Sequence, residues 1–128
     1  MKLDRRILFG IALVAALLTL PAMPVLAHHG WGGNQDAEFE LTGTLVRQVS
    51  LAGPHATMQI KDKSGQVWDI TLAPPPRTQR AGLTEKSIPL GATVMVHGHR
   101  NSDMKRFEIK TERVTWEGKV FNVYPDRT

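Results

Sequence analysis

Residues 39–46 read FELTGTLV, and this short stretch already decides the fold class. Phe39, Leu41, Gly43 and Leu45 alternate with Glu40, Thr42, Thr44 and Val46. A period of two along the chain predicts a strand that is buried on one face. A glycine inside such a strand is typical of a bend or bulge, so Gly43 indicates a strongly coiled strand of the kind that barrels contain.

The same alternation continues in two strands that follow Gly53-Pro54. Residues 62–65, DKSG, predict a turn between them, so the two strands should form a hairpin. The residues expected to point inward from these strands are Ala56, Met58, Ile60, Trp68, Ile70 and Leu72.

The second half of the domain predicts a crossover and further strands. The three prolines at 74–76 end the third strand, and residues 77–83 are expected to form a short helix. A fourth strand follows residues 89–91, a fifth starts near Arg106, and a last short one runs over residues 119–124. This order predicts an all-β fold, a small OB-like barrel of five to six strands with a helical crossover between strands three and four. A small open β-sandwich or a split barrel fits the pattern less well.

The N-terminus has the features of an export signal. Lys2, Arg5 and Arg6 precede an apolar run over residues 7–20, and residues 25–27, VLA, are typical of a cleavage site. We expect cleavage between Ala27 and His28. The alternative is a membrane anchor, but the run of about 14 residues is shorter than the ~20 needed to span a bilayer.

This assignment divides the chain and places the protein in the periplasm or outside the cell. Residues 1–27 are the predicted signal peptide, 28–37 a flexible arm, and 38–128 the barrel domain, with no membrane span after cleavage. The chain has 16 Lys+Arg and 12 Asp+Glu; the leader holds three and one of these, which leaves 13 and 11. The mature part therefore lacks the basic excess of a nucleic-acid-binding protein. It also lacks cysteine, so no disulfide stabilises it.

Several short motifs resemble the DUF6152 family of small exported bacterial proteins of unknown function. They are AHHG (27–30), LTGTL (41–45), PHA (54–56), KDKSG (61–65), RAGLT (80–84), SIPLG (87–91) and VMVHG (94–98). The family pattern has Asn-Pro-His at Gly53-Pro54-His55 and usually Gly-Trp-Thr at Gly82-Leu83-Thr84, and an acid it often places after the third strand is replaced by residues 73–76, APPP. The resemblance implies the location and the likely fold, and it carries no established chemistry.

The first candidate metal site is the new N-terminus. Cleavage would give His28 a free α-amine, followed at once by His29. The amine and the imidazole have pKa values near ~8 and ~6.5, so a divalent metal competes easily with protons at both. Nitrogen ligands in a tetragonal arrangement favour Cu²⁺. The alternative is that both histidines are ordinary polar residues of an arm.

The second candidate set lies on the fourth strand, where Met95, His97 and His99 share one face. Two imidazoles and a thioether suit copper, although side chains two residues apart need a third element to close a site. The simpler expectation is a solvated outer face. His55 at the start of a strand can join either set, and more simply it caps a turn or bonds the loop backbone.

The sequence has no catalytic signature. It has no cysteine nucleophile, HExxH, P-loop or dinucleotide fingerprint, and its serines lie in turns. Asp69 and Glu108 are expected to be solvated strand carboxylates, and a catalytic role would need a deep polar pocket around Asp69, Glu108 or His55. We therefore expect no enzyme.

Nucleic-acid binding and anion binding are two further functions to compare with the sequence. Barrels of this type often stack bases on exposed aromatic side chains, but most aromatic residues here fall on apolar faces and should be core. We expect no nucleic-acid partner. Arg77, Arg80 and Arg100 form either a local anion-binding patch or scattered surface charges.

Together these features predict an exported binding or accessory module. The first hypothesis is copper or another transition metal held by His28 and His29, with His55, His97 or His99. The second is a metal-free module that binds a small ligand, a peptide or a periplasmic partner protein on the barrel face.

Overall fold

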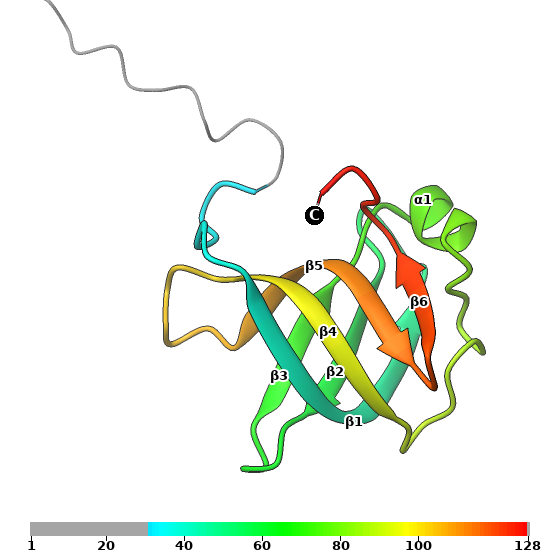
Figure 1. The fold of residues 1–128 in the computed structure, drawn as a ribbon, viewed down its shortest axis with the longest axis horizontal. Helices are drawn as coiled ribbons and strands as arrows, with labels where there is room; N and C mark the ends of the chain where they lie inside the picture. The colour runs from blue at the N-terminus through cyan, green and yellow to red at the C-terminus, as the bar shows by residue number, and fades with distance from the viewer. Residues whose placement is uncertain (1–30, 128) are drawn as a thin grey trace, which may run out of the picture.

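Six strands and one short helix make up the part of the chain that the structure, a computed structural model, describes: residues 31–127 (Figure 1). In chain order they are β1 (Phe39–Ser50), β2 (Thr57–Lys61), β3 (Val67–Thr71), α1 (Pro75–Arg80), β4 (Thr93–Arg100), β5 (Glu108–Trp116) and β6 (Lys119–Asn122). The predicted leader, the cleavage site at Ala27 and His28, and His29 lie outside the described residues.

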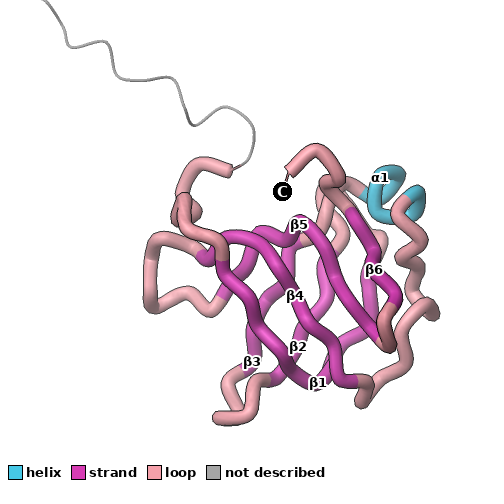
Figure 2. The backbone as a smooth tube through the Cα atoms, in the orientation of Figure 1, coloured by secondary structure: helices cyan, strands magenta, loops and turns pink. Residues whose placement is uncertain are grey.

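The strands form a closed barrel. They are ordered β3-β2-β1-β4-β5-β6, and β3 also pairs with β5, so that five strands close on themselves and β6 extends from β5 (Figure 2). The β3–β5 pairing is parallel and all the others are antiparallel. The prediction of an all-β, OB-like barrel with a helix between strands three and four is confirmed.

The long, coiled strand β1 joins the two sides of the barrel. Its first half pairs with β4 and its second half with β2 (Figure 1). Gly43 lies at the change-over, where a Cβ atom would stand 2.7 Å from the carbonyl oxygen of Lys61. The backbones therefore approach too closely for any side chain, which explains the glycine predicted to mark a bend.

The alternating apolar residues fill the barrel interior. All six positions predicted to point inward from β2 and β3 are buried. The remaining buried apolar side chains come from every other part of the barrel: Leu45, Val49, Ala73, Leu83, Ile88, Val94, Val96, Ile109, Val114, Phe121 and Val123. Because these side chains are apolar, chemistry has to be sought among the buried polar residues and on the barrel surface.

The predicted helix was placed too late. It was expected over residues 77–83, whereas α1 runs from Pro75 to Arg80. Prolines fit the first positions of a helix, where no N–H partner is needed, so residues 74–76 begin the helix as well as ending the strand. Gly82, with φ +98°, follows its end. Between residues 31 and 127, no helix has the length and apolar character that crossing a bilayer requires.

Candidate metal centre

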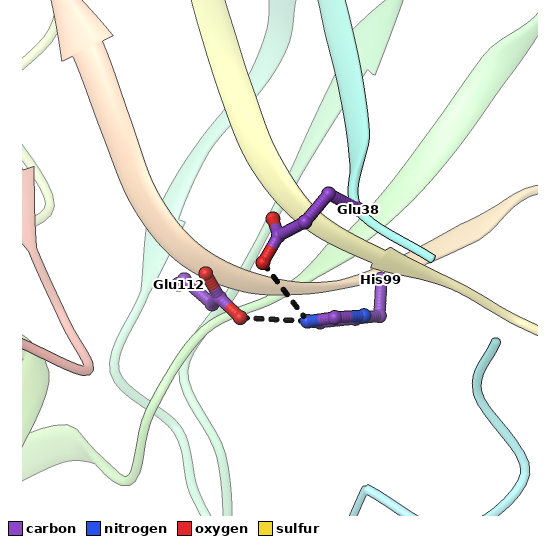
Figure 3. A group of neighbouring side chains, drawn as sticks. All are labelled: Glu38, His99 and Glu112. Carbon is purple, nitrogen blue, oxygen red and sulfur yellow. Dashed lines mark hydrogen bonds and ion pairs between the residues drawn. The ribbon is translucent and has the colours of Figure 1, made fainter. Parts of the chain in front are cut away.

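A β-bulge in β5 changes which side chains meet on the outer face. His97 pairs with Arg113 and Gly98 with Thr111, so Glu112 is an extra residue in β5. A Cβ atom on Gly98 would stand 2.1 Å from the carbonyl oxygen of Lys110, so the two backbones touch there. The bulge and this glycine together bring the side chains of Glu112 and His99 side by side (Figure 3).

His99 lies at the centre of the group. Its Nε2 atom is 2.7 Å from Oε1 of Glu112 and 3.7 Å from Oε1 of Glu38, which comes from just before β1 (Figure 3). Its Nδ1 atom is 2.9 Å from the backbone carbonyl oxygen of Gln35. His99 is 6% exposed and Glu112 is 1% exposed, so both ionisable side chains are buried.

The partners of His99 define its protonation. The carbonyl oxygen of Gln35 can only accept, so Nδ1 carries a proton and donates it. Nε2 faces the carboxylate of Glu112, which also accepts when ionised. Without a cation at this point, the short contact between Nε2 and Oε1 of Glu112 requires one proton between these two atoms. With a metal ion there, Nε2 loses the proton and ligates, while the Nδ1–H bond to a carbonyl fixes the ring as it does in many metal sites.

Glu112 has one carboxylate oxygen still available. Oε2 is buried and has no hydrogen-bond partner among the described residues. The nearby cations are loosely placed: Nη1 of Arg113 is 3.9 Å from Oε2, and Nε of Arg127 is 3.5 Å from Oε1. A buried acceptor without a hydrogen-bond partner is costly, so Oε2 is available to bind a cation.

His97 supports Glu38 and does not itself join the group. Its Nε2 atom forms an ion pair with Oε2 of Glu38. The atoms of Glu38, His99 and Glu112 that can ligate lie within 4.8 Å of one another, and His97 is outside that set. His97 therefore orients Glu38, the most exposed of the three residues.

The arm before β1 and the chain after β6 cover this face. The Trp31 ring packs edge-on against His99, at 5.6 Å between centroids, and against Tyr124 at 5.1 Å. The Arg127 guanidinium lies over the Trp31 ring at 4.0 Å. A cavity of about 60 Å³ lined by Trp31, His99 and Arg127 remains beside the group. The predicted solvated face is thus wrong for His99, because the arm and tail bury it.

The predicted metal ligands separate into three places. His99 lies in the group and His97 lies beside it. His55 lies elsewhere: its Nδ1 atom is 3.1 Å from the carbonyl oxygen of Leu72, the backbone contact that was the simpler expectation. His28 and His29 fall outside the described residues.

Sequence reasoning missed both carboxylates. Glu38 is only the first residue of the predicted barrel domain, and Glu112 lies in the predicted fifth strand without an assigned orientation. A signal for the second exists, since Glu112 and Arg113 are adjacent charged residues in the middle of a strand. Such a break in alternation is what a bulge produces.

The predicted arginine patch does not form as a set of three. Arg77 and Arg80 line one cavity at α1. The Arg100 guanidinium instead lies over the rings of Phe39, Trp68 and Phe107, at 6.0, 4.7 and 5.2 Å. Arg100 is therefore an aromatic-packing residue.

One imidazole nitrogen and two carboxylates are a suitable donor set for a transition ion. Zn²⁺ takes histidine nitrogen and carboxylate oxygen at ~2.0–2.2 Å, which separates its ligands by ~3.3–3.6 Å. The ligand atoms of Glu38, His99 and Glu112 lie within 4.8 Å of one another, so small side-chain adjustments bring them to that spacing. Cu²⁺ binds such nitrogen and oxygen sites more tightly than the other divalent ions of its row.

Comparison with solved structures gives only distant similarity. A crystal structure of the S. pombe Stn1-Ten1 complex matches with TM-score 0.49 and 18% identity, over 64% of this chain and 59% of that one. A ZRD-deleted mutant of TiaS in complex with agmatine matches with TM-score 0.48 and 17% identity, over 67% and 26%. This chain thus spans less than two thirds of either structure's chain.

Comparison with sequences places the chain in a family. No curated protein matches it. A family model described as "Family of unknown function (DUF6152)" matches residues 16–110, which include Glu38, His97 and His99 but end before Glu112. Since that match covers most of the chain, the protein belongs to the DUF6152 family.

Proposed function

We propose that this protein is an exported accessory module that binds a divalent transition metal ion through Glu38, His99 and Glu112. The observation that carries the proposal is the environment of His99. Its Nδ1 atom is fixed by the carbonyl of Gln35, its Nε2 atom faces two carboxylates, and one buried oxygen of Glu112 has no partner. A single cation could bind Nε2 of His99 and both carboxylates at once.

The burial of His99 and Glu112 supports a binding site over a chance cluster of surface charges. Exposed acidic groups collect on many protein surfaces, but Glu112 is almost completely buried. A buried ion pair is often no more stable than apolar residues of the same volume, so stability alone gives little reason to keep it. Metal binding gives a reason, because the ion would supply the missing charge.

The predicted N-terminal ligands extend the proposal. His28 and His29 precede Trp31 by three and two residues, and three residues of chain span at most about 10 Å. Trp31 packs against His99, so the described chain begins beside the group. We propose that the His28 amine and imidazole, freed by cleavage after Ala27, complete the site for Cu²⁺.

The predicted leader supports the location. An exported protein meets metal ions outside the cytoplasm. The periplasm or the exterior is therefore the compartment in which we place this module.

Calorimetric titration of the purified protein, stripped of metal with EDTA, with Zn²⁺ and Cu²⁺ tests the site. We expect one ion per chain, and at least about 10-fold to 100-fold weaker binding in His99→Asn and Glu112→Gln, because loss even of outer supporting groups has effects of that size. Glu85→Gln, an exposed loop residue, is the matched control. Unchanged stoichiometry and affinity in both site variants would overturn the proposal.

A second titration tests the N-terminal ligands separately. The protein beginning at His28 is compared with the same protein carrying one extra residue before His28. We expect the extension to weaken Cu²⁺ binding while Zn²⁺ binding at Glu38, His99 and Glu112 persists. Equal Cu²⁺ affinity in the two proteins would remove the amine from the ligand set and leave the first site standing.

A further inference from the structure

A second polar cavity, of about 440 Å³, lies where the arm crosses the parallel seam of β3 and β5. Its charged and imidazole side chains are His55, Arg106, Glu108 and Lys110. Lys110 is central to it, because this residue pairs with Thr71 of β3 and with His99 of β4.

Lys110 is a buried cation with little to balance its charge. Its residue is 5% exposed. Its Nζ atom lies 5.4 Å from the centre of the Trp31 ring and 5.7 Å from that of Tyr124. Among residues 31–127, no carboxylate lies within salt-bridge distance of Nζ.

Among residues 31–127, Nζ of Lys110 has one side-chain hydrogen-bond partner, and that partner is shared. Nζ is 3.2 Å from Nδ1 of His55, and that nitrogen is also 3.1 Å from the carbonyl oxygen of Leu72. Nδ1 can donate to the carbonyl or accept from the ammonium, but one nitrogen cannot do both. At least two of the three N–H bonds of the ammonium are therefore free for a ligand.

The other charges of the cavity balance each other. Nη2 of Arg106 is 3.0 Å from Oε2 of Glu108, and Nδ2 of Asn101 is 3.5 Å from the same oxygen. The acid of the cavity is thus neutralised by its own partner. What remains is the single positive charge of Lys110.

We propose that this cavity binds a small organic carboxylate, whose anionic group lies against Nζ of Lys110. A volume of about 440 Å³ is within the range of small-molecule sites. One uncompensated positive charge matches a monovalent anion, whereas a phosphate dianion would bring a second negative charge that the cavity does not balance. The cavity adjoins the metal centre, since Asn34 lines the cavities of both, but none of its lining residues is one of the three proposed metal ligands.

Two-dimensional ¹H–¹⁵N spectra of the metal-stripped protein, titrated with sodium propionate at constant ionic strength, test the proposal. We expect saturable shifts at His55, Lys110 and the arm residues 33–34. Sodium phosphate should bind more weakly, and phosphate binding as tight as propionate binding would overturn the assignment to a carboxylate.

Lys110→Met tests the role of the amine, with Lys119→Met on β6 as the matched control. Loss of a charge-assisted hydrogen bond should weaken propionate binding about tenfold or more in the first variant and not in the second. Equal affinity in a folded Lys110→Met protein would contradict the proposal. A measurement on the unchanged protein serves if that variant does not fold: propionate should shift the side-chain NMR signals of Lys110 saturably, and no shift at saturating propionate would also contradict the proposal.

Discussion

The outer face of the β2–β3 hairpin and the outer face of the β4–β5 pair begin from the same alternation and end in opposite states. On the hairpin, Gln59 donates to Asp69 across 2.7 Å at the exposed surface. On β4–β5, His99, Lys110 and Glu112 are all buried beneath the arm and the tail. The two faces differ in one local device, the bulge at Glu112, and in the chain that covers them.

This difference shows where chemistry is to be sought in the barrel. A solvated polar face costs nothing and requires no explanation. Buried polar and charged groups are costly unless they are paired, and Glu112 and Lys110 are only partly paired. The β4–β5 face is therefore the region where the sequence departs from what stability alone favours, which is typical of binding sites.

Gly98→Ala should give the largest loss of stability, because the added methyl group would collide with the backbone at the bulge. The added Cβ would meet backbone at 2.1 Å, against 2.7 Å for Gly43→Ala on the β1–β2 side. We expect a loss of about 3–5 kcal/mol for Gly98→Ala and about 1–3 kcal/mol for Gly43→Ala, from overpacking against backbone. Urea unfolding measures both. Equal or reversed losses would show that the β4–β5 strands can separate freely.

Glu112→Gln should separate the two faces next. It removes the charge facing buried His99, and in the metal-free protein we expect a loss of about 2 kcal/mol. Asp69→Asn on the hairpin should change stability by no more than about 0.5 kcal/mol. Chemical denaturation of the two variants side by side makes the comparison, and a Glu112→Gln effect as small as that of Asp69→Asn would argue against a coupled buried pair.

Trp31→Ala should make the covered face resemble the open one. The ring contacts His99, Tyr124 and Arg127, so its removal should cost about 1–2 kcal/mol. Hydrogen exchange of the backbone amides of residues 97–100 should accelerate, while exchange in the hairpin is unchanged. Unaltered exchange in β4 would mean that the arm does not cover the face in solution.

The smallest expected effect is on the stability of the protein at low pH, through Asp62 in the β2–β3 hairpin. Hydrogen bonds from the side chains of Ser64 and Trp68, together with backbone N–H groups of Gln66 and Ser64, hold the pKa of Asp62 at about 2, below its usual 3.8. The stability from this group is present above pH ~4 and is lost as the pH falls towards 2. Asp62→Asn should remove this part of the pH dependence. Melting temperatures between pH 5 and pH 2 check it, and identical slopes in the two proteins would contradict the assignment.

The barrel could be predicted from the sequence because the alternation of apolar and polar residues recurs in the first four strands. Alternation placed Met58, Ile60, Ile70 and Val96 inward, and turn residues separated the strands. The metal group could not be predicted in the same way. Its members come from the residue just before β1, from β4 and from β5. The sequence does not say that Glu38 and Glu112 face one histidine.

The bulge explains the rest of the failure. One extra residue in β5 places Glu112 beside His99. This bulge goes together with the close approach of the Gly98 and Lys110 backbones, which the sequence does not reveal. Alternation alone predicts His99 to be solvated. Only the path of the arm, with Gln35 bonded to His99, shows that it is covered.

Long-range ¹H–¹⁵N spectra of the five histidine side chains during a Zn²⁺ titration test the central claim most directly. In the metal-free protein we predict a proton on Nδ1 of His99 and a second proton in the hydrogen bond between Nε2 and Glu112. At saturation, Nε2 of His99 should lose this second proton and shift as a metal ligand, while Nδ1 keeps the proton that it donates to Gln35. If the signals of both nitrogens of His99 stay unchanged while Zn²⁺ binds at other histidines, the proposed metal centre is wrong.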